Sequence, residues 1–226
     1  MELREVMRTT PATREFTARE VPDRLLYDIL EHARFAPNGA NRQAWRVIVV
    51  RDPQTKKRIG ELYDLGMREY AGFLRRGLVP FVASNDGHPP PFDIETAREE
   101  PLPNEPSHIG AAPVLIVILL DSAAVSSVDS GLGRVPVCTG GSVFPFAHNI
   151  LLAARDAGLG GHLTSVLARQ EPELRSVLGI PDHFILATMV PLGWPVRQVT
   201  RLRRAAVEEF TSVEAFHGPA FFRPPG

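Results

Sequence analysis

The chain has 226 residues, with 25 Lys or Arg against 26 Asp or Glu and 44% apolar positions, so its formal charge is −1. This length supports one large domain or two small ones, with a core that needs neither disulfides nor a structural metal. A charge so close to zero gives no reason to expect a nucleic acid or a membrane surface as partner. Because Cys138 is the single cysteine, an intrachain disulfide and a cysteine-based metal cluster are both excluded.

The sequence also argues against export and membrane insertion. Residues 1–10 carry charges where a signal peptide needs an apolar stretch. The longest apolar run, 111–120, is about half of the roughly 20 residues that a membrane-spanning helix requires. We therefore expect a soluble protein, and the lone cysteine favours a reducing, cytoplasmic location.

In the first third of the chain, apolar spacing predicts a helix, a strand and a second helical region. The helix covers 22–36, with Pro22 in its first turn and Pro37 after its end. Residues 45–50, WRVIVV, form a β-branched run that predicts a buried strand. Residues 54–76 then predict one long helix or a pair of helices.

A proline-rich excursion follows at about 80–108. Seven prolines lie between Pro80 and Pro106, and no apolar period is sustained there. A long segment of this kind inside a compact chain is either a functional lid or a solvated insertion. Both interpretations stay open, and the excursion is a candidate for the surface that faces the substrate.

The second half of the chain again alternates strands and helices. Residues 113–121 are apolar throughout, which predicts a strand covered on both faces, and 142–157 show helical spacing that stops at Gly158. A short helix is expected at 172–178 and a further strand at 184–192. Interleaved helices and strands without an internal repeat predict a single domain over 1–226, of α/β or α+β class, with a central sheet under helical cover.

The C-terminal arm, about 205–226, differs from the rest. It ends in HGPAFFRPPG, which is rich in proline and aromatic residues but lacks a useful helical or strand period. So apolar a tail is not expected to hang free in water. It should pack on its own body or wrap a partner subunit, and the second alternative requires a dimer.

Motifs for several common chemistries are missing from the sequence. The dinucleotide fingerprint G-x-G-x-x-G fails at both Gly131 and Gly158, and neither a P-loop, a G-x-S-x-G elbow nor an HExxH helix occurs. The seven histidines are scattered, and a lone histidine is more often structural than a ligand. Cys138 has no histidine nearby in sequence that would activate it. We therefore expect no metal, and a thiol nucleophile at Cys138 would require a partner that only the fold could bring to it.

Basic and hydroxyl residues near both ends of the chain offer a phosphate site. Guanidinium groups bind phosphate oxygens through paired, charge-assisted hydrogen bonds, and threonine hydroxyls can complete the set. Ordinary surface charge would also explain these residues, so both interpretations remain. The candidates are Arg8, Thr9, Thr10, Arg14, Arg201 and Arg203.

Two further clusters lie between predicted elements. In the loop 37–45, amide side chains and a glycine could meet the edge of a heteroaromatic ring, although turn formation alone would explain them. In 158–165, glycines free backbone N–H groups to face a ligand, but a helix cap followed by a tight turn explains them equally well. The candidates are Asn38, Gly39 and Asn41 in the first cluster and His162, Leu163 and Thr164 in the second.

Taken in this order, the clusters resemble the nitroreductase family of FMN-dependent oxidoreductases. RTTPATREF at 8–16 is similar to that family's opening Arg-Arg-Ser-x-Arg-x-Phe, and APNGANRQAW at 36–45 to its Ala-Pro-Ser-x-x-Asn-x-Gln-Pro-Trp segment. GLGG at 158–161 and the stretch 173–195 resemble its second half. The departures are an insertion, Pro11-Ala12, in the first motif, Asn38 in place of Ser and Ala44 in place of Pro.

The resemblance implies an α+β fold, an α/β/α sandwich with a mixed, mainly antiparallel sheet, assembled as an intertwined homodimer with shared FMN sites. The residues near both ends of the chain would hold the FMN phosphate, and the loop 37–45 would reach the flavin from the partner subunit. Thr164 and the backbone of His162 and Leu163 would lie along the N5 and O4 edge of the flavin.

The activity implied by the resemblance needs no catalytic side chain. NADH or NADPH would pass hydride to N5 of FMN, and the reduced flavin would pass electrons to a nitroaromatic or quinone-like acceptor, while the protein supplies placement and water exclusion. Other flavin chemistry on the same scaffold remains open: dehydrogenation, reductive dehalogenation or flavin breakdown. A flavin-binding module without turnover is a further alternative. The natural acceptor and the choice between NADH and NADPH are not readable from the sequence.

Overall fold

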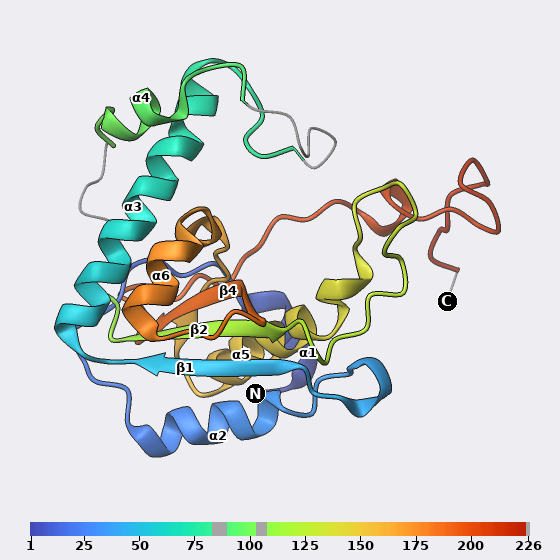
Figure 1. The fold of residues 1–226 in the computed structure, drawn as a ribbon. Coiled ribbons are helices and arrows are strands. Elements are labelled where there is room, and N and C mark those ends of the chain that lie inside the picture. The colour runs from blue at the N-terminus through green and yellow to red at the C-terminus, as the bar shows by residue number, and fades with distance from the viewer. Residues whose placement is uncertain (83–89, 103–107, 225–226) are drawn as a thin grey trace.

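The computed structural model describes residues 1–82, 90–102 and 108–224 (Figure 1). The helices are α1 (Leu3–Thr9), α2 (Asp23–Ala33), α3 (Pro53–Arg75), α4 (Ile94–Glu99), α5 (Val143–Asp156) and α6 (Glu171–Leu178). The strands are β1 (Trp45–Val50), β2 (Val114–Asp121), β3 (Gly160–Gly161) and β4 (Phe184–Gly193). Short 3₁₀ helices are η1 (Gly39–Asn41), η3 (Cys138–Gly141), η4 (Val166–Gln170) and η5 (Val207–Glu209).

The four strands form one sheet in the order β1-β2-β4-β3, and all neighbouring strands run antiparallel. β2 pairs with both β1 and β4, with a bulge between Ile118 and Leu119. Within the described residues, the parallel pairing that makes the arrangement mixed is the isolated bridge between Ala12 and Gly161. The prediction of a mainly antiparallel sheet is therefore confirmed.

Side chains along a strand alternate between the two faces of the sheet. Since β2 is apolar up to Leu120, both faces carry apolar side chains, and helices cover each of them. Val114, Ile116 and Ile118 pack into a core with residues of α2 and α5 on one face. Leu115 and Val117 pack into a second core with residues of α3 and α6 on the other face (Figure 1). β2 is buried up to Leu120, as its continuous apolar run predicts. The fold is α+β, with a sheet between two helical layers.

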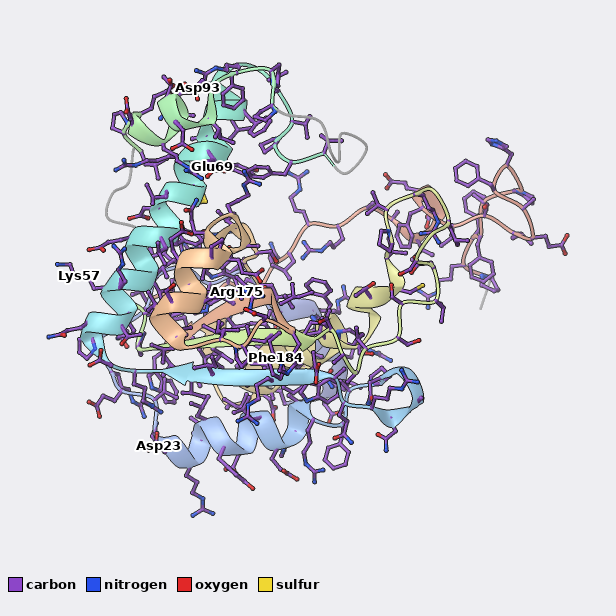
Figure 2. The ribbon with its side chains drawn as sticks, viewed as in Figure 1. Asp23, Lys57, Glu69, Asp93, Arg175 and Phe184 are labelled. Carbon is purple, nitrogen blue, oxygen red and sulfur yellow. The ribbon has the colours of Figure 1, made fainter. Side chains whose placement is uncertain are left out.

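Most elements lie where apolar spacing places them. The region 54–76 is one continuous helix, α3, whose first turn is capped by Asp52 through the backbone N–H of Thr55. α2 ends at Ala33, earlier than the predicted 36. On α6, Arg175 pairs with Glu171 and donates to the carbonyl oxygen of Phe184, so this helix is tied to the start of β4 (Figure 2).

Two short helices have no counterpart in the sequence prediction. α1 contains a single buried residue, Val6, so it offers no apolar period to recognise. α4 lies inside the proline-rich excursion, where the side chain of Asp93 accepts from the backbone N–H of Glu95. The excursion is thus partly helical in 90–102, while the predicted loop at 83–89 and 103–107 lies outside the described residues.

The C-terminal arm runs away from the sheet and its helical layers (Figure 1). Phe210, Phe216, Phe221 and Phe222 each keep more than half of their surface exposed. In the described part of the arm, up to residue 224, these rings therefore do not pack closely against the rest of the chain. That the arm wraps a partner subunit remains a prediction. Across the described ranges, each helix is too short or too polar to cross a membrane.

Close packing of α3 on η4 gives a test of the fold. A Cβ atom on Gly66 would lie 2.8 Å from Cγ1 and 2.9 Å from the carbonyl oxygen of Val166. Alanine in a helix interior normally stabilises by about 1 kcal/mol relative to glycine. Here overpacking should reverse the sign, so we predict that Gly66→Ala lowers the free energy of unfolding by about 1–3 kcal/mol.

Denaturant unfolding measures this change. Gly141→Ala is the matched control, because nothing lies within 4 Å of the added Cβ atom. A Gly66→Ala protein as stable as the control would contradict the close approach of α3 and η4.

Candidate functional site

The segment after α1 docks on the edge of the sheet beside β3. The backbone N–H of Thr13 donates to the carbonyl oxygen of Gly161 at 2.9 Å, next to the bridge between Ala12 and Gly161. Glycine is required at 161, because a Cβ atom there would lie 2.7 Å from the carbonyl oxygen of Pro191. The pairing brings the first and third polar clusters of the sequence together, although about 150 residues separate them in the chain.

A hollow of about 890 Å³ lies between α1 and the segment 200–203. Arg8, Thr9, Arg201 and Arg203, four of the six predicted phosphate residues, are among the side chains that line it. Arg4 adds a further cation, and two glutamates also face the hollow, so its lining carries a formal charge of +2. The structure therefore joins residues from the two ends of the chain into one electropositive site.

The hydroxyls of Thr9 and Thr10 are already used within α1. They donate to the carbonyl oxygens of Glu5 and Val6 at 2.8 and 2.7 Å. A phosphate accepts hydrogen bonds, so in this arrangement the side-chain donors left among the predicted residues are the guanidinium groups. Thr10 is absent from the lining of the hollow.

Arg155 does not line the hollow but holds Thr9, which does, and the sequence analysis made no prediction for it. It is 9% exposed, and its Nε donates to the carbonyl oxygen of Thr9 at 2.9 Å and to the hydroxyl at 3.1 Å. A cation at the C-terminal end of α1 is favourable to the helix dipole. The available signal was a charged residue at a position of α5 where the helical period places apolar side chains.

Arg14, the sixth predicted phosphate residue, does not line the hollow. Its positive charge instead acts on His108 and His162, whose pKa values it lowers. Between Arg8 and Arg14, Ala12 pairs with Gly161 of β3.

Buried His162 and half-buried His108 form a pair beside the glycine-rich turn. Nδ1 of His162 lies 2.8 Å from the carbonyl oxygen of Thr13, so this nitrogen carries the hydrogen and Nε2 accepts. Nε2 of His108 lies 3.4 Å from Nε2 of His162, which makes His108 the donor in the neutral pair. The sequence analysis predicted a backbone role for His162 and missed His108, which lies 54 positions away in the chain.

Burial keeps this histidine pair neutral. His162 is 4% exposed, and desolvation lowers its pKa to about 4, with smaller effects from His108 and Arg14. Desolvation also lowers the pKa of His108, followed by the charge of Arg14, while Asp64 opposes the shift. The rings of His108 and His162 are thus uncharged at neutral pH.

The glycine-rich turn presents a free hydroxyl. The backbone of Thr164 pairs with Met189 in both directions, at 3.0 and 2.9 Å, which fixes this residue against β4. Thr164 is 9% exposed, and its hydroxyl makes no hydrogen bond within the described ranges. Leu163, its neighbour, is 38% exposed.

The loop 37–45 is held in a strained conformation. The amide of Asn38 is used locally, since it donates to the carbonyl oxygen of Ala36 and accepts from the backbone N–H of Gln43. The N–H of Gly39 donates to the hydroxyl of Ser142. Ala40, Asn41 and Gln43 all have positive φ, which costs energy in residues with a side chain and is concentrated at functional sites.

Comparison of the sequence with models of protein families assigns the chain to a family. The model of the nitroreductase family matches residues 7–194. The chain belongs to the nitroreductase family. The resemblance drawn from the sequence motifs is thereby confirmed.

Relatives within the nitroreductase family carry different names. The chain is 27% identical over 210 residues to iodotyrosine deiodinase 1 of Mus musculus, which covers 92% of this chain and 68% of that protein. It is 26% identical over 196 residues to a protein named NADH dehydrogenase from Thermus thermophilus, which covers 82% of each. A crystal structure of iodotyrosine deiodinase bound to FMN and 3-iodo-L-tyrosine has a TM-score of 0.67 at 19% identity and covers 95% of this chain and 100% of that one.

The neutral state of His162 predicts a pH dependence of stability. The native pKa of about 4 lies below the unfolded value of about 6.5, so the unfolded chain binds the proton first as the pH falls. Stability from this group is complete above about pH 6.5 and is lost toward pH 4, by up to about 3 kcal/mol. Urea unfolding across this range measures it.

The control for this measurement is His162→Asn, whose amide N–H can replace Nδ1 as donor to Thr13 but does not titrate. Its stability should fall less between about pH 6.5 and pH 4 than that of the original protein. Parallel losses in the two proteins would contradict the assignment to His162.

Proposed function

We propose that this chain is an FMN-dependent oxidoreductase that reduces nitroaromatic or quinone-like acceptors with electrons from NADH or NADPH, and that it acts as a homodimer. The observation that carries the proposal is the electropositive hollow at the end of α1. Arg8, Arg201 and Arg203 converge there from the two ends of the chain. Their combined charge fits the dianionic phosphate of FMN.

The ring of the flavin would lie along the glycine-rich turn. Residues 8–13 lead from the hollow to β3, so a ligand whose phosphate lies at Arg8 can extend toward Thr164. The free hydroxyl of Thr164 can donate to a heteroatom of the ring, beside the backbone of His162 and Leu163. Thr9, Thr10 and Arg14 remain proposed members of the site, with Arg14 placed at the histidine pair rather than at the hollow.

The second side of the ring would come from a partner subunit. Asn38, Gly39 and Asn41 lie in the strained loop, and we propose that this loop completes the flavin site of the partner. The exposed phenylalanines of the C-terminal arm support an intertwined dimer, because burying them against a partner removes a large apolar surface from water.

Bound FMN would supply the hydride and electron transfer. The residues of this chain would hold the phosphate, orient the ring, and exclude water from one face through Leu163 and the paired rings of His162 and His108. Since both histidines are neutral at neutral pH, their electrostatic effect on the ring is that of dipoles rather than of cations.

A second candidate activity is reductive dehalogenation of an aromatic acceptor. The identity of 27% to iodotyrosine deiodinase 1 of Mus musculus favours it, since the match covers 92% of this chain. Both activities use the same proposed cofactor, and they differ in the acceptor.

The phosphate site predicts a difference between two flavins. Arg203→Ala should weaken FMN binding by about 10- to 100-fold, because one charge-assisted contact contributes about 1.5–3 kcal/mol, and Arg8→Ala should do the same. Riboflavin lacks the phosphate, so its affinity should stay unchanged. Fluorescence titration with both flavins measures this.

The control for the flavin titration is Arg58→Ala, which removes an exposed cation of α3 that pairs with Glu61. Equal loss of riboflavin and FMN affinity, or unchanged FMN affinity in both hollow variants, would count against this phosphate site.

The activity is tested by anaerobic stopped-flow mixing of the FMN-loaded protein with NADH and with NADPH. Rapid bleaching of the flavin, followed by reoxidation with a nitroaromatic, a quinone or 3-iodo-L-tyrosine, is the expected result and ranks the two candidate activities. A protein that is colourless and binds no added FMN, or a flavin that neither reductant bleaches, would overturn the reductase proposal.

A further inference from the structure

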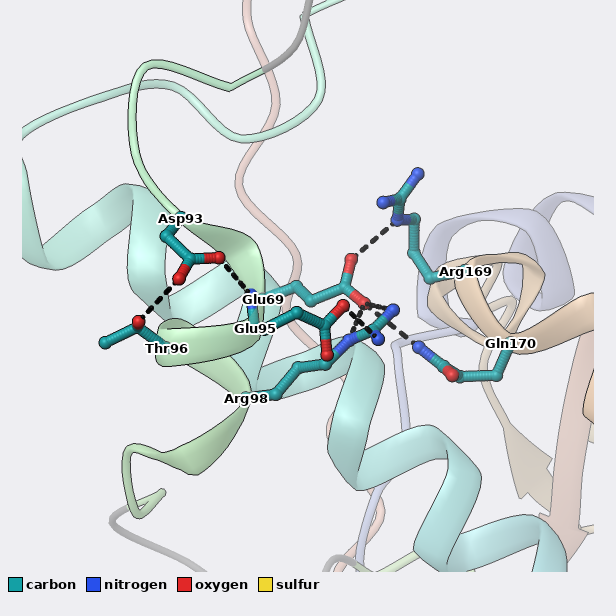
Figure 3. Close-up of polar contacts among 7 residues, drawn as sticks. All are labelled: Glu69, Asp93, Glu95, Thr96, Arg98, Arg169 and Gln170. Carbon is teal, nitrogen blue, oxygen red and sulfur yellow. Dashed lines mark hydrogen bonds and ion pairs between the residues drawn. The ribbon is translucent and has the colours of Figure 1, made fainter.

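Above the glycine-rich turn, one buried carboxylate joins three elements. Glu69 of α3 is fully buried and accepts hydrogen bonds from Arg98 of α4 and from Arg169 and Gln170 of η4 (Figure 3). A buried charge is tolerated only when it is paired and hydrogen-bonded, which these donors achieve. The cluster therefore fixes the helical part of the proline-rich excursion, and the end of η4, at one point.

The two arginines of this cluster are used differently. Arg98 commits all three guanidinium nitrogens: Nε and Nη2 bond Glu69 at 2.7 Å, and Nη1 bonds Glu95 at 2.6 Å. Among the residues that the structure describes, Arg169 commits Nε alone, to Oε2 of Glu69 at 2.7 Å. Its two Nη groups point away from Glu69 in Figure 3, and its side chain is 43% exposed. Arg169 thus offers an oriented, open pair of donors.

A strained aromatic residue holds the guanidinium of Arg169 from the side. The ring of Phe81 lies 5.2 Å from it, within the range of a cation–π contact. Phe81 has a positive φ of 49°, which is costly for a bulky residue and is maintained by contacts of its ring with Tyr70 and Phe73. Phe81 lies near the start of the excursion, so this contact joins the excursion to Arg169.

Arg169 also lies close in the chain to the proposed flavin edge. It follows Thr164 by five residues, of which the last ones belong to η4. At about 2 Å per residue in the 3₁₀ helix and about 3.3 Å per extended residue, the two residues are at most about 13 Å apart along the backbone. A ligand stacked on the flavin ring could span this distance with a substituent.

We propose that Arg169 recognises an anionic group, a carboxylate or a phosphate, on the ligand that occupies the acceptor side of the flavin, and that Glu69 is its positioning residue. The inference rests on the proposed function and specifies its substrate class as anionic aromatic compounds. The guanidinium fork matches the two oxygens of a carboxylate in a bidentate contact. Prior fixation by Glu69 and Phe81 reduces the entropy lost when such a ligand binds.

The test compares two acceptors that differ in one charge, para-nitrobenzoate and its methyl ester. In the FMN-loaded enzyme, Arg169→Gln should raise KM for the anion by about 10- to 100-fold and leave kcat and KM for the ester within about twofold. Arg169→Lys keeps the charge without the fork and should recover part of the affinity. Glu69→Gln should raise KM for the anion but not for the ester, because it removes the charge that positions Arg169.

Arg98→Gln is the matched control, because it removes the other guanidinium from the same carboxylate and touches no open donor. If Arg169 only holds η4 against α3, the two arginine variants will change the kinetic constants of para-nitrobenzoate and of its ester alike, and the proposal is overturned. Unchanged kinetics in Arg169→Gln also overturn it. Thermal unfolding of each variant identifies effects that come from lost stability.

Two further measurements make the result independent of the wider proposal. Calorimetric titration of the oxidised enzyme with para-nitrobenzoate measures binding without turnover, and Arg169→Gln should raise its Kd by about tenfold or more. An inactive protein that still binds the anion through Arg169 would therefore reject the reductase activity and support this inference. A rise in KM for NADPH but not for NADH in Arg169→Gln would place the anion on the reductant's extra phosphate instead of on the acceptor.

Discussion

The pairing of residues 12–13 with Gly161 is the interaction on which the candidate site depends. A backbone hydrogen bond and a bridge dock residues 12–13 on the sheet edge, and Nδ1 of His162 adds a contact through the carbonyl oxygen of Thr13. A second bridge, between Phe16 and Pro195, holds the segment farther along. Because neither glycine of β3 has a side chain, Thr13 can approach Gly160 closely and β4 can approach Gly161. This places an electropositive hollow at one end of the segment and the free hydroxyl of Thr164 at the other.

The sheet supports this junction from within. β2 is buried on both faces and pairs with β1 and β4. β1 begins at the end of the loop 37–45, and the end of β4 pairs with β3 in the glycine-rich turn. α3 extends well past the sheet (Figure 1) and carries Glu69, so one long helix links the core to the proline-rich excursion. The excursion is therefore anchored to the fold by an ion cluster rather than by apolar packing alone.

The total charge of this molecule is close to zero, but charged groups gather at individual sites. A formal charge of −1 for the chain coexists with a hollow of +2 and with a fully buried carboxylate shared by two arginines. Elsewhere, backbone N–H groups of Val137 and Cys138 lower the pKa of Asp129 far below its usual range. Nucleophile and metal motifs are absent from the sequence, which fits a protein whose reactivity is proposed to lie in a cofactor.

The sequence by itself determined the α+β class, the long helices, the apolar strands and the nitroreductase resemblance, because apolar periodicity and three ordered motifs are local properties of the chain. It missed α1 and α4, which bury too few residues to show a period. Only the tertiary structure joined Arg8 to Arg203, placed Arg14 beside His162, and revealed Arg155, His108 and the cluster around Glu69. These contacts link residues far apart in sequence, and no local pattern encodes which distant side chains will meet.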